Sequence, residues 1–381
     1  MPGTTVLIKL RPLLNLMVAL MLAGCVTNPI SYEEAPPKIR HDLTEYPIFN
    51  DQVTGIAVSR EGRIFVNFPR WVNDPLYSVA EVLPDGTLRP YPDNNWNRWG
   101  TDEKRQPGAH FICVQSVFVD KGDRLWILDA ASPGFKGVIQ GGAKLIEVNL
   151  ATDRVERVFP FDATTAPINS YLNDVRLDPR GDFAYITDSG SGAIVLLDLS
   201  NGSSRRLLAN DPSTKAEPGF TPVINGRELR DEQGHPPQIH ADGLALDTKG
   251  DYLYYHALTA RSLFRIKTEL LRDQTLTEPQ LASHVERLAE TGAVDGMVMD
   301  SNDNLYFTAL EEDAVKRYSP QGKISTVIQD PHILWPDSMA ITFDNYLYFT
   351  ASQIQRMPRF NHGKDLRAPP YSYFRTWVGM E

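Results

Sequence analysis

Residues 295–308 read DGMVMDSNDNLYFT, and residues 337–350 read DSMAITFDNYLYFT. Each stretch begins with an aspartate and a small residue, continues with a short apolar run, passes through a turn rich in Asp and Asn, and ends in a run of aromatic residues. Apolar alternation on both sides of such a turn is typical of a β-hairpin. Both stretches therefore predict a hairpin of the same kind.

The hairpin pattern occurs six times, in units that begin 42 to 69 residues apart. The units are Thr54–Asn67, Gln115–Asp129, Asn173–Asp188, Asp242–His256, Asp295–Thr308 and Asp337–Thr350. A propeller blade has four strands and needs about 40 residues or more, so each interval leaves room for two further strands. The sequence therefore predicts an all-β chain folded as a six-bladed β-propeller. A two-sheet sandwich, the alternative, predicts no such regular recurrence.

The segments between the hairpins carry weaker signals. Outer strand pairs are expected at 143–149 with 155–161, at 193–199 with 204–208 and at 314–318 with 324–328, and a helix is expected at 263–272. Irregular insertions are expected at 71–111 and 210–241. Four tryptophans lie in or near the insertions: Trp71, Trp96, Trp99 and Trp335. Two roles are open for them, namely packing between blades or forming the wall of a pocket for an aromatic or sterol-like ligand.

The N-terminus has the features of an export signal. Lys9 and Arg11 precede an apolar run at 13–22, which ends in Leu-Ala-Gly-Cys with the cysteine at Cys25. A basic start, a short apolar core and small residues before a cysteine are typical of a bacterial lipoprotein signal peptide. We therefore expect residues 1–24 to be a signal peptide, Cys25 to be lipidated, residues 25–45 to be a tether and residues 46–381 to be one propeller domain.

The expected location follows from this signal. Val26 after the cysteine favours the outer membrane over the inner one, so we expect an exported lipoprotein on the periplasmic face, in contact with the membrane only through its lipid. An ordinary signal peptide followed by secretion is the alternative.

Charge and cysteine content limit the partners and the chemistry. The chain has 38 basic and 48 acidic residues and a net charge of −10, without a cluster of Lys and Arg, so we expect no nucleic-acid partner. Cys113 is the only cysteine besides Cys25, so we expect no disulfide within the domain. A lone cysteine beside an apolar run is expected to be a small buried side chain.

Five motifs resemble the major royal jelly protein/yellow family. They are Arg89–Pro92 followed by Trp96 and Asn97, the DRLWILD run at 123–129, NSYLNDV at 169–175, YITDSG at 185–190, and WPDS at 335–338. The resemblance covers about Asp51 to Val378 and suggests a bacterial branch. It implies a six-bladed propeller but fixes no chemistry, because its relatives are linked to pigment-precursor conversion, to binding of amines or sterols, and to nutrition.

The first residue of each unit is expected at the mouth of the central channel. These residues are Thr54, Gln115, Asn173, Asp242, Asp295 and Asp337, with Asp174 beside Asn173 and His240 two positions before Asp242. Carboxylates on one small circle resist joint ionisation, so their pKa rises or a cation binds. The alternative is that the aspartates cap strand starts by accepting backbone N–H bonds. The turn acids Asp178, Asp247 and Asp300 are expected to be purely structural.

The mouth also resembles that of the calcium-dependent gluconolactonase-type propellers. This resemblance implies that Asn173, Asp242 and Asp295 hold Ca²⁺ and that Asp295 is the catalytic acid/base. Asp242 stands where that family has Asn, and Thr54 stands where it has a metal-binding Glu.

Two functions therefore stay open, and the sequence does not decide whether the protein is an enzyme. The first is binding of a small organic ligand, such as a cationic amine, at the channel mouth. The second is a metal-assisted lactonase or hydrolase, or an isomerase of the dopachrome type, with Asp295 as catalytic residue. No motif for a serine nucleophile, a zinc site or a phosphate loop is present.

Overall fold

The computed structural model describes residues 1–4, 42–100 and 106–379. The expected signal peptide, Cys25 and most of the expected tether lie outside the described residues, so lipidation and export stay predictions. Among the described residues, no helix is long and apolar enough to cross a membrane.

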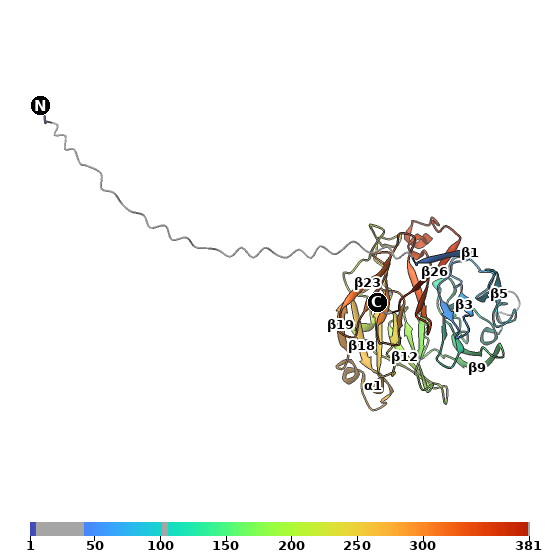
Figure 1. The fold of residues 1–381 in the computed structure, drawn as a ribbon. Coiled ribbons are helices and arrows are strands. Elements are labelled where there is room, and N and C mark those ends of the chain that lie inside the picture. The colour runs from blue at the N-terminus through green and yellow to red at the C-terminus, as the bar shows by residue number, and fades with distance from the viewer. Residues whose placement is uncertain (5–41, 101–105, 380–381) are drawn as a thin grey trace. The chain divides into compact units, whose positions relative to one another are not determined.

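The described strands form six four-stranded antiparallel sheets and one small hairpin (Figure 1). Blade 1 contains β2 (Ile56–Val58), β3 (Ile64–Asn67), β4 (Val79–Val82) and β5 (Leu88–Pro90). Blade 2 contains β6 (Val114–Val119), β7 (Arg124–Asp129), β8 (Lys144–Asn149) and β9 (Arg154–Pro160). Blade 3 contains β10 (Leu172–Leu177), β11 (Phe183–Asp188), β12 (Ala193–Asp198) and β13 (Ser204–Leu207). Blade 4 contains β16 (Ala241–Leu246), β17 (Tyr252–Ala257), β18 (Ser262–Lys267) and β19 (Glu286–Glu290). Blade 5 contains β20 (Met297–Met299), β21 (Leu305–Ala309), β22 (Ala314–Tyr318) and β23 (Ile324–Gln329).

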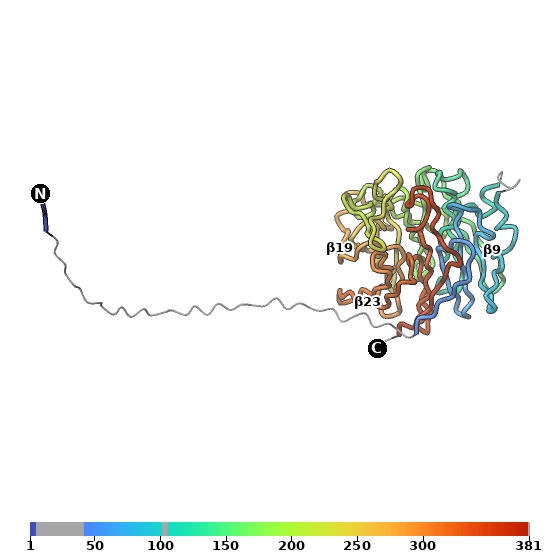
Figure 2. The backbone as a smooth tube through the Cα atoms, turned by 90° about the horizontal axis from the view of Figure 1, so that it is seen from above, coloured from blue at the N-terminus to red at the C-terminus, as the bar shows by residue number. Residues whose placement is uncertain are grey.

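Blade 6 joins the two ends of the domain. It contains β24 (Pro336–Ile341), β25 (Tyr346–Ala351), β26 (Tyr371–Trp377) and, as its outermost strand, β1 (Thr44–Phe49). Figures 1 and 2 show the blue N-terminal strand beside the red C-terminal one. Tyr46 stacks on Tyr373 with ring centroids 4.5 Å apart. Because β1 begins at Thr44, the sheet includes two residues that the sequence analysis assigned to the tether.

The innermost strands complete a circle. In the order β2, β6, β10, β16, β20 and β24, each contacts the next, and β24 contacts β2. The prediction of a six-bladed β-propeller is confirmed. The expected outer strand pairs are present in blades 2, 3 and 5, with ends that differ by at most one residue.

The expected helix at 263–272 is wrong over its first half. Residues Ser262–Lys267 form β18, and only Thr268–Arg272 form the helix α1. Leu263 and Ile266 are both buried although they lie three positions apart in one strand. This spacing of apolar residues also matches one face of a helix.

The remaining short elements lie in the connections. They are the helix α2 (Glu278–Ala282), the hairpin of β14 (Val223–Ile224) and β15 (Arg227–Glu228), and the 3₁₀ turns η2 (Pro107–Ala109), η3 (Pro133–Phe135), η4 (Pro212–Thr214), η5 (Ile354–Arg356) and η6 (Pro358–Phe360). The hairpin β14–β15 lies in the second expected insertion, and η2 lies in the first.

The hydrophobic core is divided into layers between adjacent blades. Cys113, Trp126 and Leu128 of blade 2 pack in one buried cluster with Val175 and Val195 of blade 3. Cys113 is a free, fully buried thiol, as the sequence predicts. Burial of apolar surface is the main stabilising term in folding, and here each blade contributes to two such layers.

In blades 4 and 5, the innermost strand approaches the next blade so closely that the residue after the mouth aspartate has no room for a side chain. A Cβ atom on Gly243 would lie 2.1 Å from the carbonyl oxygen of Asp295, and one on Gly296 would lie 2.1 Å from the carbonyl oxygen of Asp337. The Asp-Gly pairs of the repeat are therefore a consequence of strand-to-strand contact between blades.

A buried polar link crosses two other junctions of the circle. In blade 3, Thr187 Oγ1 accepts a bond from the backbone N–H of Asp174 at 3.1 Å and donates to the carbonyl of Asp242 in blade 4. Thr350 donates in the same way from blade 6 to the carbonyl of Thr54 in blade 1. Buried backbone carbonyls need such partners, so these two threonines fix blade 3 against blade 4 and blade 6 against blade 1.

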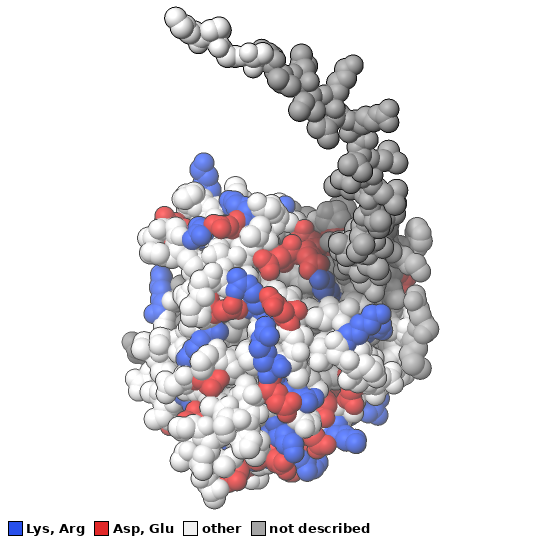
Figure 3. All heavy atoms as spheres, turned by 90° about the vertical axis from the view of Figure 1, so that its left-hand side faces the viewer, with Lys and Arg blue, Asp and Glu red and all other residues white. Residues whose placement is uncertain are grey.

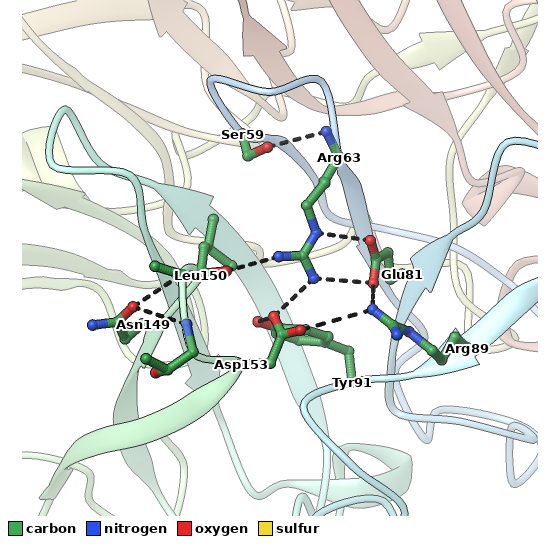
Figure 4. A network of polar contacts seen from close by, with 10 residues as sticks. Ser59, Arg63, Glu81, Arg89, Tyr91, Asn149, Leu150 and Asp153 are labelled. Atoms are coloured by element: carbon green, nitrogen blue, oxygen red, sulfur yellow. Dashed lines mark hydrogen bonds and ion pairs between the residues drawn. The ribbon is translucent and has the colours of Figure 1, made fainter.

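An ionic network joins the outer parts of blades 1 and 2 (Figure 4). Arg63 donates to Glu81 and to Asp153, both at 2.8 Å, and to the carbonyl of Leu150 at 2.9 Å. Tyr91 donates to the same carboxylate of Asp153 at 2.8 Å. Asp153 lies in the turn between β8 and β9, so the guanidinium of one blade is bound to the turn of its neighbour.

The described charges on one outer face are mixed in sign. The face on the left-hand side of Figure 1, which carries β19 and β23, shows basic and acidic side chains interleaved (Figure 3). Arg265 on β18 and Glu286 on β19 form one such pair at 2.8 Å. This face therefore offers no large field of one sign.

The close approach of the innermost strands predicts the effect of one added methyl group. In Gly296→Ala, the Cβ atom meets backbone on two sides, with Ser338 Cα at 3.0 Å besides the carbonyl of Asp337. We expect the free energy of unfolding to fall by about 2 to 3 kcal/mol, measured by equilibrium denaturation. Gly108→Ala is the control, because its nearest obstacle is 3.7 Å away, and we expect a change within about 0.5 kcal/mol. Equal stability of the two variants would show that the contact does not restrict the strand.

Candidate functional site

A cavity of about 150 Å³ opens at the channel mouth. It is lined by Trp71, Gln115, Phe135, Tyr171, Asn173, Ser189, Gly190, Gln238, Ile239, Asp242, Leu258, Asp295, Trp335, Asp337, Ile354 and Arg359. An apolar cavity of about this volume holds one benzene molecule. The mouth therefore has room for one ring-sized group, bounded by polar residues of the innermost strands and by aromatic residues of the connections.

A chain of hydrogen bonds runs around one side of the cavity, and each residue in it donates to the next one. Trp71 Nε1 donates to Tyr171 Oη at 2.5 Å, and Tyr171 donates to Gln115 Oε1 at 3.0 Å. Gln115 Nε2 donates to Asn173 Oδ1 at 3.2 Å, and Asn173 Nδ2 donates to Asp242 Oδ2 at 2.8 Å. Four blades are linked in this way, and the chain ends on a carboxyl group.

Three buried acids form the other side. Asp242 and Asp295 each influence the pKa of the other, and Trp335 Nε1 donates to Asp295 Oδ2 at 2.7 Å. Burial raises the pKa of Asp295 to about 7. Burial and then the charge of Asp295 raise the pKa values of Asp242 and Asp337 well above their usual range. The three groups therefore carry less than three negative charges at neutral pH.

Asp337 is the least satisfied of the three acids. It is 2% exposed, and its Oδ2 atom has no hydrogen-bond partner among the described residues. Its Oδ1 atom accepts only a long bond of 3.3 Å from Ser338. A buried oxygen without a hydrogen-bond donor lowers the stability of the fold by about 1 to 3 kcal/mol. A ligand that donates a hydrogen bond to this atom would remove that cost.

The mouth acids and the turn acids differ in their backbone contacts. Asp178, Asp247 and Asp300 accept backbone N–H bonds within their hairpin turns, at 2.7, 3.0 and 2.8 Å respectively. Among the described residues, no backbone N–H donates to the side chains of Asp242, Asp295 or Asp337. The turn acids thus have a structural explanation that the mouth acids lack.

Trp335 is held beside these acids in a strained backbone conformation. Its φ angle is +60°, a region that costs a residue with a side chain about 1 to 3 kcal/mol. Its carbonyl accepts the N–H of Ser352 at 3.0 Å, and its side chain is fully buried. The strain is thus maintained by packing and by the indole bond to Asp295, which orients that carboxylate.

Three of the residues expected at the mouth lie outside the cavity lining. Thr54 is buried, and its hydroxyl donates to the carbonyl of Gln115 at 3.2 Å. Asp174 accepts from Ser116 at 3.0 Å and lies 3.7 Å from the guanidinium of Arg176. His240 Nδ1 accepts the backbone N–H of Ala216 at 2.9 Å, and burial lowers its pKa. These side chains are engaged in contacts within the fold.

Phe135, Tyr171 and Arg359 line the cavity, and sequence reasoning did not assign them to it. Phe135 and Arg359 lie on the 3₁₀ turns η3 and η6, outside the repeat, so no periodic signal marks them. Tyr171 lies within the family motif at 169–175, and this motif is a sequence signal that could have assigned it to the site. Of the four tryptophans, Trp71 and Trp335 line the cavity, while Trp96 packs on Phe111 with centroids 5.1 Å apart.

Two buried ion pairs position the segments that enter the cavity. Asp188, at the end of β11, accepts the backbone N–H of Tyr171 at 2.8 Å and pairs with Arg206 at 2.7 Å. Asp129, at the end of β7, accepts the backbone N–H of Cys113 at 2.9 Å and pairs with Lys144 at 2.8 Å. Cys113 is followed directly by β6, which carries Gln115. The two acids therefore hold in place the residues of the hydrogen-bonded chain.

The residues expected to hold Ca²⁺ do not fit that ion as they are arranged. Asn173 turns its amide N–H toward Asp242, and its oxygen is occupied by Gln115. The three expected residues on their own supply too few side-chain oxygens for Ca²⁺, which takes six to eight oxygen ligands. Among the described residues, no group of three or more His, Cys, Asp and Glu side chains is placed to hold a metal ion.

Comparison with known proteins gives a family match and several distant relatives. A family model described as major royal jelly protein matches residues 112–367. Major royal jelly protein 5 of Apis mellifera is 23% identical over 287 residues, which are 71% of this chain and 44% of that protein. Protein yellow of Drosophila subobscura is 24% identical over 325 residues, which are 78% of this chain and 54% of that protein. The chain spans about half the length of these relatives.

Solved structures resemble the fold at low sequence identity. A gluconolactonase from Xanthomonas campestris has a TM-score of 0.53 at 12% identity, covering 89% of this chain and 90% of that one. A luciferin-regenerating enzyme has a TM-score of 0.52 at 13% identity, covering 88% and 96%. At this identity the likeness concerns the fold alone.

The raised pKa of Asp295 predicts how stability depends on pH. The folded protein holds this proton up to about pH 7, whereas an unperturbed aspartate releases it near 3.8. The stabilising effect of the protonated group is complete below pH 3.8 and is lost as the pH rises to about 7, by at most about 1.4 kcal/mol per pH unit. Wild type should therefore lose stability relative to Asp295→Asn over this range, measured by urea denaturation at several pH values. The exposed Asp42→Asn is the control, and an equal slope for all three proteins would contradict the prediction.

Proposed function

The chain belongs to the major royal jelly protein family, as its motifs predicted, and from that premise we propose that the channel-mouth cavity binds a small organic molecule through a protonated amine. The observation that carries the proposal is the set of three buried acids at the cavity, one of which has an oxygen without a donor. An ammonium group has three N–H donors and a positive charge.

The electrostatics support a cationic group at this wall. Asp242, Asp295 and Asp337 have raised pKa values mainly because burial disfavours their charged forms. A cation beside them favours ionisation, so its binding is linked to release of a proton. The ammonium therefore gains a charge-assisted hydrogen bond, which is stronger than a neutral one.

The apolar walls support an organic body. Trp71 and Tyr171 each lie near Phe135, with ring centroids 5.3 Å apart in both pairs. Ile239, Leu258 and Ile354 also line the cavity. Pockets that bind small molecules combine apolar walls with placed polar groups, and this cavity has both, with polar or charged side chains at half of its lining residues.

The proposal predicts binding of 2-phenylethylamine and its dependence on Asp337. We expect calorimetric titration to show that the amine binds more tightly than the neutral 2-phenylethanol. Asp337→Asn keeps the shape and removes the charge, so it should weaken amine binding by about tenfold or more, since a hydrogen bond to a charged group is worth about 1.5 to 3 kcal/mol. Alcohol binding should not change.

Asp344→Asn is the matched control, because Asp344 is an exposed acid in the hairpin turn of the same blade and lies outside the cavity. It should bind the amine as wild type does. Absence of amine binding at millimolar concentration, or equal affinity in Asp337→Asn, would refute the proposed function.

A second candidate is an enzyme that transfers a proton with Asp295. One observation favours it: a carboxyl group with a pKa of about 7 lines the cavity, hydrogen-bonded to a second acid and to an indole N–H. A general acid/base works best when its pKa lies near the operating pH. The candidate reactions are lactone hydrolysis and isomerisation of the dopachrome type.

Turnover of δ-gluconolactone and of dopachrome tests this candidate. If the protein is an enzyme, kcat should rise or fall through an apparent pKa near 7, and Asp295→Asn should lower kcat by about 100-fold or more. Added Ca²⁺ should have no effect, because the residues do not fit the ion. Turnover that Asp295→Asn retains would exclude Asp295 as the catalytic group.

A further inference from the structure

Arg359 brings an uncompensated positive charge to the same cavity. Its guanidinium lies over the rings of Phe135 and Phe360, at 4.3 and 4.7 Å from their centroids. In the part of the chain that the structure describes, Arg359 makes no ion pair, and its Nε atom is buried without a hydrogen-bond partner. Burial lowers the pKa of this arginine to about 10. Arg359 is only partly buried, and of its guanidinium nitrogens only Nε is buried without a partner. The guanidinium is therefore free to pair with a carboxylate that enters the cavity.

The cation and the acids come from different segments of the chain. Arg359 lies over the ring of Phe135, whose centroid is 5.3 Å from that of Tyr171. Trp335, directly before β24, donates to Asp295. Among the described residues, no carboxylate pairs with the guanidinium, although Arg359 and the acids line one cavity. We call Arg359 with Phe135 the cationic wall of the cavity and the three aspartates its acidic wall.

We infer that the ligand of this cavity is a zwitterion, with an ammonium group at Asp337 and a carboxylate at Arg359. The inference rests on the proposed function and names the ligand class for the same site. A carboxylate accepts two parallel N–H bonds from a guanidinium, which gives both affinity and orientation. A ring-bearing amino acid has both charged groups on one carbon and an apolar body for the aromatic walls.

Ligands with one charge leave half of the site unsatisfied. An amine satisfies Asp337 but leaves the guanidinium of Arg359 without a counter-charge. A carboxylic acid satisfies Arg359 but places a negative charge in the cavity that holds the acids. A zwitterion neutralises both walls and adds no net charge to a buried site, where unpaired charge is costly.

Three probes with the same skeleton test this inference by calorimetric titration: L-phenylalanine, 2-phenylethylamine and 3-phenylpropanoate. We expect L-phenylalanine to bind about tenfold or more tightly than either of the others. Arg359→Met keeps an apolar stem of similar length and should reduce L-phenylalanine affinity to that of the amine. The affinity of the amine should stay within twofold, which also shows that the variant is folded.

Two further variants complete the set. Arg359→Lys retains the charge but not the paired donors, so its affinity for L-phenylalanine should lie between wild type and Arg359→Met. Arg356→Met is the control, because Arg356 lies on the neighbouring turn η5 and does not line the cavity. Its affinities should equal those of wild type.

The outcomes separate this inference from the proposed function. If the amine binds and depends on Asp337, but L-phenylalanine binds no better and Arg359→Met has no effect, the zwitterion is refuted and the amine site stands. If L-phenylalanine depends on Arg359 but not on Asp337, the amine contact is refuted and the carboxylate contact stands. If no probe binds, both are refuted.

Discussion

The contact between neighbouring innermost strands is the constraint on which the rest of the structure depends. Gly243 and Gly296 show how tight it is, since a Cβ atom on either would lie 2.1 Å from a backbone carbonyl of the next blade. Thr187 and Thr350 hydrogen-bond across two further junctions, between blades 3 and 4 and between blades 6 and 1. Six strands held at this distance form a narrow circle, and the strand β1 closes it by completing the last blade.

The narrow circle also explains the chemistry of the mouth. Residues that begin the innermost strands are drawn together by the strand contact, so Asp242, Asp295 and Asp337 are buried beside one another. Because burial disfavours their ionisation, the acids retain protons near neutral pH. A fold stabilised by apolar layers between blades can maintain such a locally unfavourable cluster, which is typical of sites that bind or react.

The sequence predicted the parts of this protein that repeat. The six hairpins and the circle of blades follow from one pattern of apolar alternation and turn residues. Of the eight residues expected at the mouth, five line the cavity, and Thr54, Asp174 and His240 do not. The helix expected from residue 263 is wrong because Leu263 and Ile266 are buried three positions apart in a strand. Phe135 and Arg359 could not be predicted, because each lies on a single 3₁₀ turn whose position depends on the whole fold. That Arg359 lines the same cavity as the three aspartates is therefore apparent only from the structure.

The two walls of the cavity differ in how freely they can change. The acidic wall belongs to the repeat, and in blades 4 and 5 its aspartate precedes a glycine that the next blade leaves no room to replace. Arg359 lies on the turn η6, outside the six sheets. Substitution of Arg359 is therefore expected to change the charge of the cavity without disturbing the circle of strands.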